Sequence, residues 1–388
     1  MRAAVFRAPG DVRIESVPEP AAPGPGELLI KVSKAALCGT DSAEWDHGPL
    51  LARPPVILGH EFTGQVVAVG PDTTGSDTTG PDAGAAAGPQ AGGPGPGGFG
   101  LGDRVVSGAG ISCGHCEWCA AGRTNLCASY QTLGLHRDGG LAEYVLSPAS
   151  ICRAVPDGLD DVGAAMAQPL AVALHAARRG RVGPGRSCVV IGAGGIGAFI
   201  VAAAAALGAR PLVAVDVAAD RLKTAAALGA THTVLADSGP VGTVLASTVV
   251  PASTGCADRG DLVQAALAAV GEDGAHVVIE ASGAPASPAA ALEMVRRGGD
   301  VVIVGLQAHP FGIDLFSVAT REVDLHGTLA HVCGEDLSEA VAVLAGTRLA
   351  RTVLGDVIAL DDLVEGGLRP LAERKAHGKI VVDVQGSA

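Results

Sequence analysis

Four cysteines lie within fifteen residues of one another, in the stretch CGHCEWCAAGRTNLC. Their spacing is C-x2-C-x2-C-x7-C, and the residues are Cys113, Cys116, Cys119 and Cys127. Four thiolates this close along a chain can surround a zinc ion tetrahedrally. An iron–sulfur cluster is an alternative, but the ferredoxin run has another spacing and a proline after its last cysteine, where this chain has Ala128. Because four cysteines leave no open position for a substrate, we predict a structural zinc site.

A second group of candidate metal ligands is more widely spaced: Cys38 in AALCGTDS, and His60 and Glu61 in LGHEFTG. Each residue alone has an ordinary structural interpretation, namely a buried thiol, a core histidine and a surface glutamate. A catalytic zinc site uses three protein ligands and keeps a fourth position open, and cysteine and histidine suit it. The three residues are therefore candidates for a catalytic zinc site.

The stretch VVIGAGGIG carries the glycine pattern G-x-G-x-x-G of dinucleotide-binding folds. Its candidate cofactor-binding residues are Gly192, Gly194, Gly195, Ile196 and Gly197. The pattern follows a strand-like run and opens a helix-like run, as a pyrophosphate site at a helix N-terminus requires. Asp216 ends the next strand-like run, where it can accept hydrogen bonds from the adenosine ribose and repel a 2′-phosphate, so we expect NAD. Arg221 could face the ribose or the phosphates, although a solvated surface position is the ordinary interpretation.

The elements that must position these residues differ along the chain. In the N-terminal part, short β-rich runs such as ELLIKVSKAAL and GQVVAVG are separated by Pro and Gly. From Arg186 onward, continuous apolar strands alternate with helices, which is typical of a parallel sheet covered on both faces. We predict an α/β protein with a β-rich domain and a doubly wound parallel-sheet domain.

Two stretches interrupt these patterns. Residues 71–100 are nearly all Gly, Ala, Pro, Asp and Thr. They cannot bury enough apolar area to fold, so we predict a flexible insertion there. Residues 236–261 look like a second loose insertion.

Composition argues against several classes of partner. The net charge is −13 and no basic cluster is present, so we expect no nucleic-acid partner. The N-terminus has no apolar signal-peptide core, so we expect a cytoplasmic protein whose cysteines are thiols rather than disulfides. The stretch 187–209 is apolar enough to suggest a membrane span, but its glycine pattern favours the dinucleotide fold, and no membrane partner is expected.

Several motifs, taken in combination, resemble those of the zinc-dependent medium-chain dehydrogenases of the alcohol dehydrogenase superfamily. They are CGTD, GHEFTG, the four-cysteine segment, AQPLAVALHAARR, VVIGAGGIG and VAVDVAADRL. The chain looks most like the sorbitol, butanediol and threonine dehydrogenase branch, and CGTDSAEWDHG is particularly similar to the polyol dehydrogenase pattern. The resemblance covers essentially the whole chain apart from the two insertions.

This resemblance implies the domain organisation. A GroES-like catalytic domain is expected at residues 1–157 and a Rossmann NAD-binding domain at 158–306. Residues 307–388 are expected to return to the catalytic domain, with the active site in the cleft. We also expect a homodimer or a homotetramer.

The same resemblance implies roles for individual residues. Cys38 and His60 are expected to bind a catalytic zinc, joined by Glu61 or by Gln168, so that each chain would hold two zinc ions. Thr40 is expected to receive the alcohol proton, and it follows Cys38 closely enough to reach an oxygen at the site. The residues expected beside the nicotinamide are Val304, Gly305 and Leu306.

Two positions depart from the pattern of the branch. Gln168 precedes the PLA run where the branch usually has glutamate, so its amide oxygen is expected to bind zinc weakly or to lie just outside the coordination sphere. Ala43 replaces the histidine that often forms the outer end of the proton relay. His47 is close in sequence and could substitute, although an exposed loop position is the ordinary interpretation of a single histidine.

We expect an oxidoreductase that transfers a hydride between NAD(H) and a secondary alcohol, diol, polyol or cyclitol, or the corresponding ketone. One alternative is an NAD(P)H-dependent reductase of C=O or C=N bonds that works mainly in the reductive direction. The other is a non-catalytic NAD(H)-binding protein, which would have no need of Cys38, His60 and Glu61 together.

Overall fold

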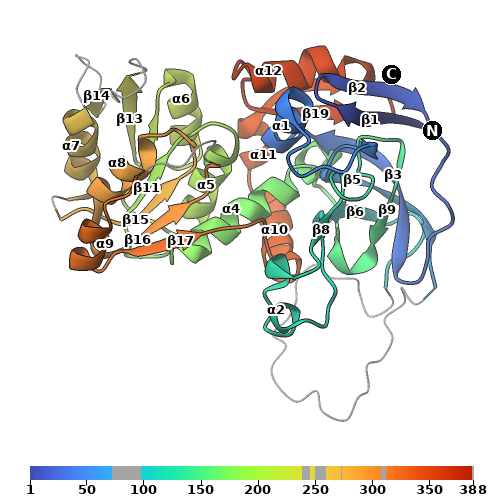
Figure 1. Ribbon diagram of the computed structural model, residues 1–388, viewed down its shortest axis with the longest axis horizontal. Helices are drawn as coiled ribbons and strands as arrows, with labels where there is room; N and C mark the ends of the chain where they lie inside the picture. The colour runs from blue at the N-terminus through green and yellow to red at the C-terminus, as the bar shows by residue number, and fades with distance from the viewer. Residues whose placement is uncertain (72–97, 238–244, 250–258, 272, 307–311, 387–388) are drawn as a thin grey trace, which may run out of the picture. The chain divides into compact units, whose positions relative to one another are not determined.

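The computed structural model describes residues 1–71, 98–237, 245–249, 259–271, 273–306 and 312–386. These residues form two compact units (Figure 1). Unit 1 comprises Met1–Ala171 and His331–Ala388, and unit 2 comprises Val172–Ala330. The predicted insertion at 71–100 lies almost entirely outside the described residues.

The helices and strands follow one another in the order shown by the colours of Figure 1. The elements of unit 1 are β1 (Arg2–Ala8), β2 (Asp11–Ser16), β3 (Glu27–Ala36), α1 (Gly39–His47), β4 (Val56–Ile57), β5 (Glu61–Val69), β6 (Arg104–Ser107), β7 (Gly110–Ile111), α2 (Glu117–Ala120), the 3₁₀ turn η1 (Thr124–Leu126), β8 (Gln131–Thr132), β9 (Tyr144–Pro148), β10 (Cys152–Ala154), α3 (Asp161–Ala164), α10 (Ser338–Gly346), α11 (Leu349–Val353), β18 (Leu354–Ala359), α12 (Arg369–Ala372) and β19 (Lys379–Asp383). Helix α4 (Ala167–Arg179) runs from unit 1 into unit 2. The elements of unit 2 are β11 (Cys188–Ile191), α5 (Gly195–Ala206), β12 (Leu212–Asp216), α6 (Ala219–Ala227), β13 (His232–Asp237), β14 (Leu245–Val249), α7 (Arg259–Val270), β15 (Ala275–Glu280), α8 (Ser287–Met294), β16 (Val295–Ile303), α9 (Leu315–Arg321) and β17 (Asp324–Gly327).

The unit boundaries lie later in the chain than the domain boundaries expected at residues 157 and 306. The first is later because α3 packs on β3 and β5 of unit 1. The second is later because β17 pairs with β16 and extends the sheet of unit 2. Each boundary thus follows an element that contacts or pairs with strands of its own unit.

Unit 1 is built on a sheet in which β3 is central. The strand order is β10-β6-β5-β3-β19-β18, and β9 also pairs with β3. Leu28, Ile30 and Val32 alternate along β3 and are fully buried, as expected for a strand with one face against a core. At the end of β3, Ala36 pairs with Glu61 of β5 and with Val381 of β19. Segments from both ends of the chain therefore meet where β3 ends.

Unit 2 contains a seven-stranded sheet flanked by helices (Figure 1). The strand order is β14-β13-β12-β11-β15-β16-β17, and all neighbours are parallel except β13 and β14. The strands β11 and β12 are buried along their whole length, which explains their continuous apolar sequences. The predicted doubly wound parallel sheet is confirmed, and its order reverses between β11 and β15.

Two predictions about unit 2 need comment. Strand β14 lies inside the stretch 236–261, for which we predicted a loose insertion, and it pairs antiparallel with β13. The apolar stretch 187–209 is divided into β11 and the twelve-residue helix α5, and no helix in the described part of the chain is long and apolar enough to cross a membrane.

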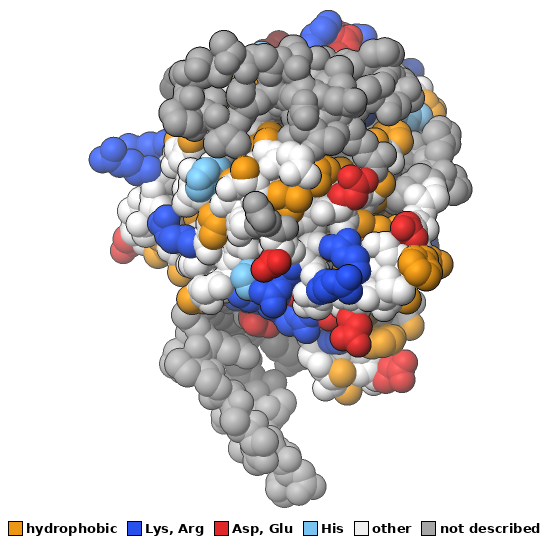
Figure 2. All heavy atoms as spheres, turned by 90° about the vertical axis from the view of Figure 1, so that its left-hand side faces the viewer, with side chains coloured by type: hydrophobic (Ala, Val, Ile, Leu, Met, Phe, Trp, Pro, Cys, Tyr) orange, Lys and Arg blue, Asp and Glu red, His pale blue; other side chains and the backbone are white. Residues whose placement is uncertain are grey.

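On the face drawn in Figure 2, Lys and Arg side chains lie among Asp and Glu side chains.

Candidate functional site

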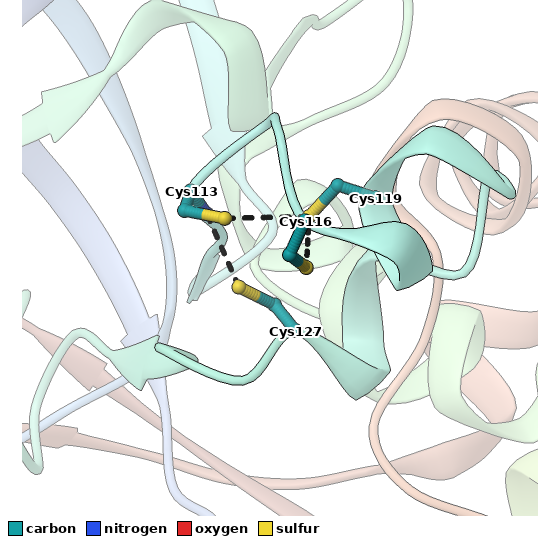
Figure 3. Close-up of side chains that lie close together, drawn as sticks. All are labelled: Cys113, Cys116, Cys119 and Cys127. Atoms are coloured by element: carbon teal, nitrogen blue, oxygen red, sulfur yellow. Dashed lines mark hydrogen bonds between the residues drawn. The ribbon is translucent and has the colours of Figure 1, made fainter.

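The four cysteines of the C-x2-C-x2-C-x7-C segment converge on one point (Figure 3). Cys116 precedes α2, Cys119 lies within it, and Cys127 follows η1, so two short helical turns aim their sulfurs inward. All four sulfur atoms lie within 4.8 Å of one another, and none of the four cysteines forms a disulfide. The local chain therefore suffices to assemble this group.

Backbone N–H groups stabilise negative charge on these sulfurs. Cys127 Sγ accepts hydrogen bonds from the backbone N–H of Cys113 at 3.2 Å and of Ser129 at 3.3 Å. Backbone N–H groups, that of Cys119 foremost, lower the pKa of Cys116 to about 6, whereas burial raises the pKa of Cys119 to about 11. Four thiols with such donors fit a closed tetrahedral zinc site, so the predicted ligands match the ion.

The second predicted group is also brought together. Ligand atoms of Cys38, His60 and Glu61 lie within 4.8 Å of one another. Cys38 lies between β3 and α1, while His60 and Glu61 lie where β5 begins. The pairing of Ala36 with Glu61 across β3 and β5 places the two segments side by side. We call Cys38, His60 and Glu61 the buried ligand cluster. The register between β3 and β5 assembles it.

Asp41 supports the buried ligand cluster and was missed at the level of sequence. Its Oδ2 accepts a hydrogen bond from the backbone N–H of Cys38 at 2.9 Å, and its Oδ1 lies 3.5 Å from Nδ1 of His60. A carboxylate on one ring nitrogen is the usual partner of a metal-binding histidine, because it orients the ring and leaves the other nitrogen for the metal. Asp41 is the fourth residue of the motif CGTD. This place in the motif was the signal from which its role could have been predicted.

The acidic groups beside His60 favour a positive charge on its ring. Burial lowers the pKa of His60, but the charges of Asp41 and Cys38 outweigh it and raise that pKa to about 10. Nδ1 of His60 and Oδ1 of Asp41 are buried and form no hydrogen bond among the described residues. A divalent cation would compensate such a field. The cysteine, histidine and glutamate donors fit the set that zinc accepts in catalytic sites.

Lys379 is a second residue that sequence reasoning missed. Its Nζ lies 2.5 Å from Oε2 of Glu61, and both side chains are largely buried. Lys379 is the first residue of β19, which reaches the cluster because β19 pairs with β3. Glu61 therefore has a cationic partner as well as a place among the candidate ligands.

The remaining predicted residues of unit 1 lie in different surroundings. Thr40 Oγ1 accepts from Cys38 Sγ at 3.6 Å, so the hydroxyl lies beside the buried ligand cluster. Gln168 is buried in α4 with 9% of its surface exposed. His47 ends α1, its side chain is 67% exposed, and it pairs with Asp46 at 3.0 Å. His47 comes seven positions after Thr40 on the helix, a rise of about 10 Å, so the structure does not bring His47 to the cluster.

The glycine motif of unit 2 forms the turn between β11 and α5. Gly192 has φ +92°, which favours glycine, and a Cβ on Gly197 would lie 1.8 Å from the carbonyl oxygen of Gly192. Gly194 caps α5, and the exposed Gly195 and the half-buried Ile196 begin the helix. The N-terminus of α5 thus has the backbone geometry that suits a pyrophosphate.

Asp216 is held against this turn. Its Oδ2 accepts a hydrogen bond from the N–H of Ala193 at 2.7 Å, and its Oδ1 accepts one from the N–H of Ala218 at 2.9 Å. Nη1 of Arg221 lies 3.6 Å from Oδ1, and the guanidinium lies 3.1 Å from where a Cβ on Gly194 would be. Asp216 and Arg221 therefore both lie beside the glycine turn, and their roles toward a cofactor stay predictions.

The predicted nicotinamide residues follow β16. The backbone N–H groups of Val304 and Gly305 donate to the carbonyl of Glu280 at 2.8 and 3.0 Å. A Cβ on Gly305 would lie 2.3 Å from the backbone nitrogen of Gly283, so this close approach requires glycine. Leu306 is 87% exposed. Glu280, which the sequence analysis did not single out, positions this turn from the end of β15.

A third group of acidic residues and histidine has another explanation. Ligand atoms of Asp300, Asp324 and His326 lie within 4.8 Å of one another. Asp300, however, is fully buried and pairs with Arg181 at 2.5 Å and with Arg186 at 2.6 Å. Two guanidinium groups already neutralise the carboxylates, so this group is a salt-bridge network.

Two family models match the chain. "Alcohol dehydrogenase GroES-like domain" matches residues 24–157, and "Zinc-binding dehydrogenase" matches residues 195–346. A Neosartorya fischeri protein named "Probable D-xylulose reductase A" is 31% identical over 380 residues, which are 96% of this chain and 94% of that protein. The sorbitol dehydrogenase of Bacillus subtilis is 30% identical over 332 residues, 84% of this chain and 81% of that protein.

Solved structures show the same architecture. A Sinorhizobium meliloti protein named "putative zinc-binding dehydrogenase", bound to NADP, has a TM-score of 0.79 and 29% identity, covering 98% of both chains. The 2R,3R-butanediol dehydrogenase of Bacillus subtilis has a TM-score of 0.78 and 26% identity, covering 98% of this chain and 99% of that one. The predicted combination of a GroES-like domain and a Rossmann domain is confirmed. The chain therefore belongs to the zinc-dependent medium-chain dehydrogenases of the alcohol dehydrogenase superfamily, as its motifs predict.

Proposed function

We propose that this protein oxidises a secondary alcohol, diol, polyol or cyclitol with NAD, or reduces the corresponding ketone with NADH. The observation that carries the proposal is the buried ligand cluster of Cys38, His60 and Glu61 with Thr40 beside it. When bound, zinc supplies a Lewis acid that lets an alcohol lose its proton near neutral pH, and NAD accepts the hydride. The relatives include proteins named for xylulose, sorbitol and butanediol, which agrees with this substrate class.

Different residues of unit 1 would bind the metal, orient a ligand and transfer the proton. Cys38 and His60 would hold the zinc, with Glu61 or the amide oxygen of Gln168 completing the set. Asp41 would keep the His60 ring oriented, since it lies on the ring nitrogen Nδ1. The Thr40 hydroxyl would accept the alcohol proton and pass it toward solvent. The four cysteines of the other cluster would hold a second zinc that takes no part in the reaction.

Cofactor choice rests on Asp216. Its buried carboxylate beside the glycine turn would disfavour the 2′-phosphate of NADP, so we propose a preference for NAD. Arg221 is a cation that could attract such a phosphate, and the Sinorhizobium relative was solved with NADP. The ratio of kcat/KM for NAD to that for NADP tests this preference, and a ratio of one or less would refute the role of Asp216.

A mainly reductive enzyme is the second candidate function. Its support is that Ala43 stands where the branch usually has the relay histidine, and that His47 lies exposed at the other end of α1. A reductase of C=O or C=N bonds depends less on such a relay. The buried ligand cluster argues against a protein that only binds NAD(H), because a pure binder has no use for it.

The deciding experiment combines turnover with metal analysis. NADH formation is measured across secondary alcohols, diols, sugar alcohols, amino alcohols and cyclitols, and NADH consumption across the matching ketones and imines. Two zinc ions per chain are expected, and removal of the more labile one should stop turnover. Fully active protein with one zinc per chain would refute the catalytic role of the buried ligand cluster. Location in the cytoplasm and a homodimeric or homotetrameric state stay predictions.

A further inference from the structure

Glu280 is a fully buried carboxylate at the end of β15, and the proposed function assigns it no role. Its Oε1 accepts hydrogen bonds from the backbone N–H of Ser282 at 2.8 Å and of Gly283 at 3.0 Å. It also accepts from the hydroxyl groups of Ser282 at 2.6 Å and of Ser287 at 2.8 Å. A buried carboxylate is unfavourable unless donors replace its water. These donors do so, and in return the carboxylate fixes the turn that follows β15.

The same residue lies against the turn that follows β16. The backbone carbonyl of Glu280 accepts hydrogen bonds from the N–H groups of Val304 and Gly305, at 2.8 and 3.0 Å. Its Oε2 is buried and forms no hydrogen bond among the described residues, and a Cβ on Gly305 would lie 2.6 Å from it. Glu280 therefore contacts two turns that belong to neighbouring strands.

The turn after β15 is packed between two other turns. On one side, a Cβ on Gly192 of the glycine turn would lie 2.8 Å from Cα of Ser282. On the other side, a Cβ on Gly305 would lie 2.3 Å from the backbone nitrogen of Gly283. A shift of the turn after β15 would therefore displace its neighbours, because these backbones are already in contact.

The strand order indicates which part of a dinucleotide would meet these turns. The strands β12, β11, β15 and β16 are neighbours in this order, and the order reverses between β11 and β15. A dinucleotide binds across the carboxyl ends of the strands at such a reversal. Asp216 at the end of β12 is the candidate ribose acceptor, and the N-terminus of α5 suits the pyrophosphate. The nicotinamide half is therefore expected over the ends of β15 and β16.

The two turns are accessible to a ligand, whereas the side chains that hold the first of them are not. Ser282 and Ala284 are exposed, and Leu306 is 87% exposed. Glu280 and Ser287 are buried. Exposed loop residues that are fixed by buried polar groups are typical of a preorganised binding site.

We propose that Glu280 is a positioning residue for the nicotinamide half of the cofactor. Its carboxylate holds the turn after β15, and the contact between Gly283 and Gly305 transmits this position to the turn after β16. The nicotinamide carries a carboxamide, which has both a donor and an acceptor group. Backbone C=O and N–H groups of correctly placed turns satisfy such a group. This inference rests on the proposed use of NAD(H).

The test measures binding of NADH and of ADP-ribose, which lacks the nicotinamide, to the full chain. Fluorescence titration measures the first and calorimetry the second. Glutamine at position 280 has nearly the shape of glutamate but offers one neutral acceptor oxygen. In Glu280→Gln the Kd for NADH should rise about tenfold, while the Kd for ADP-ribose should change less than about twofold. Glu322→Gln makes the same change at an exposed position of unit 2 and should leave both Kd values unchanged.

Ser287→Ala is a second, milder variant of the same network. Ser287 Oγ lies 2.8 Å from Oε1 of Glu280 and 2.6 Å from the carbonyl oxygen of Ala284. Loss of this hydroxyl should raise the Kd for NADH roughly threefold. Amide hydrogen exchange at residues 282–284 should accelerate in both variants. If Glu280→Gln does not fold, Ser287→Ala decides the test.

The outcomes separate this inference from the proposed function. Equal weakening of NADH and ADP-ribose would mean that Glu280 only stabilises unit 2, and it would overturn the positioning role. NADH binding at the parent level in both variants would overturn it as well. A parent that binds NADH but converts no alcohol or ketone would refute the proposed reaction, and selective loss of NADH binding in the variants would still support Glu280. A parent that binds neither ligand would overturn both.

Discussion

The two candidate metal clusters of unit 1 are built in opposite ways. The four cysteines from Cys113 to Cys127 come from one continuous segment, and two short helical turns suffice to aim them at one another. The candidate ligands Cys38, His60 and Glu61 lie next to the ends of two strands, and a third strand supplies Lys379. The first cluster is locally encoded, whereas the second depends on strand register across the sheet.

The two clusters also differ in their exposure to solvent and in the groups that surround them. Three of the four cysteines in the local segment are partly exposed, and backbone N–H groups supply donors to their sulfurs. In the buried ligand cluster His60 and Glu61 are buried, and Asp41 and Lys379 provide charged partners for them. The comparison teaches that a closed local cluster can stabilise a loop. A cluster assembled from distant segments can instead keep a metal position open beside charged side chains such as Asp41 and Lys379.

The largest effect should come from removing a ligand of the assembled cluster. Cys38→Ser is expected to lower kcat on the order of a thousandfold or more, because Lewis-acid assistance contributes several kcal/mol to the transition state. The variant should keep its fold and one zinc ion per chain. Steady-state kinetics with metal analysis measure both. Cys188→Ala is the control. Cys188 is a buried cysteine of β11 that belongs to neither candidate metal cluster, so this variant should retain activity.

Removing a ligand of the local cluster should affect stability before activity. Cys119→Ser is expected to lose one zinc ion and to lower Tm on the order of 10 °C, since a structural zinc contributes folding free energy directly. Turnover measured well below the new Tm should stay within a few-fold of the parent. Scanning calorimetry and metal analysis test this prediction. A variant that keeps Tm and zinc but loses turnover would reverse the roles of the two clusters.

A smaller effect is expected beside the assembled cluster, where no ligand is removed. Thr40→Val should reduce kcat about a hundredfold at neutral pH, because a proton-transfer partner is lost while the zinc content is kept. Thr40→Ser retains a hydroxyl and should recover most of the rate. If Thr40→Val turned over at the parent rate, solvent would be taking the proton directly, and the role of Thr40 would be wrong.

The smallest effect is expected at the third ligand-like group, in unit 2. Asp324 is exposed and pairs with Arg181 at 2.6 Å, and an exposed ion pair contributes about 0 to 1 kcal/mol. Asp324→Asn should therefore shift Tm by only a few degrees and leave the zinc content at the parent value. Metal analysis of this variant sharpens the comparison, because a lost ion would mean that the arginines do not exclude a metal there.

Some features of the site could be predicted from local sequence alone. The cysteine spacing and the glycine pattern act over short stretches, and the short turns at Gly114 and Gly122, both with positive φ, need only their own neighbours. The alternation of apolar strands and helices predicted the parallel sheet of unit 2 for the same reason. Strand β14 was missed because its low-complexity surroundings gave no periodic signal, and it is a strand through its pairing with β13.

The sequence by itself determined which residues could carry chemistry, because residue type and short spacing decide what a turn or a strand end can bind. Only the tertiary structure decided what supports them. Lys379 reaches Glu61 through the pairing of β19 with β3, and Glu280 meets the turn after β16 because β15 and β16 are neighbours in the sheet. The burial of these charges, and hence the strength of their interactions, depends on the packing of segments far apart in the chain.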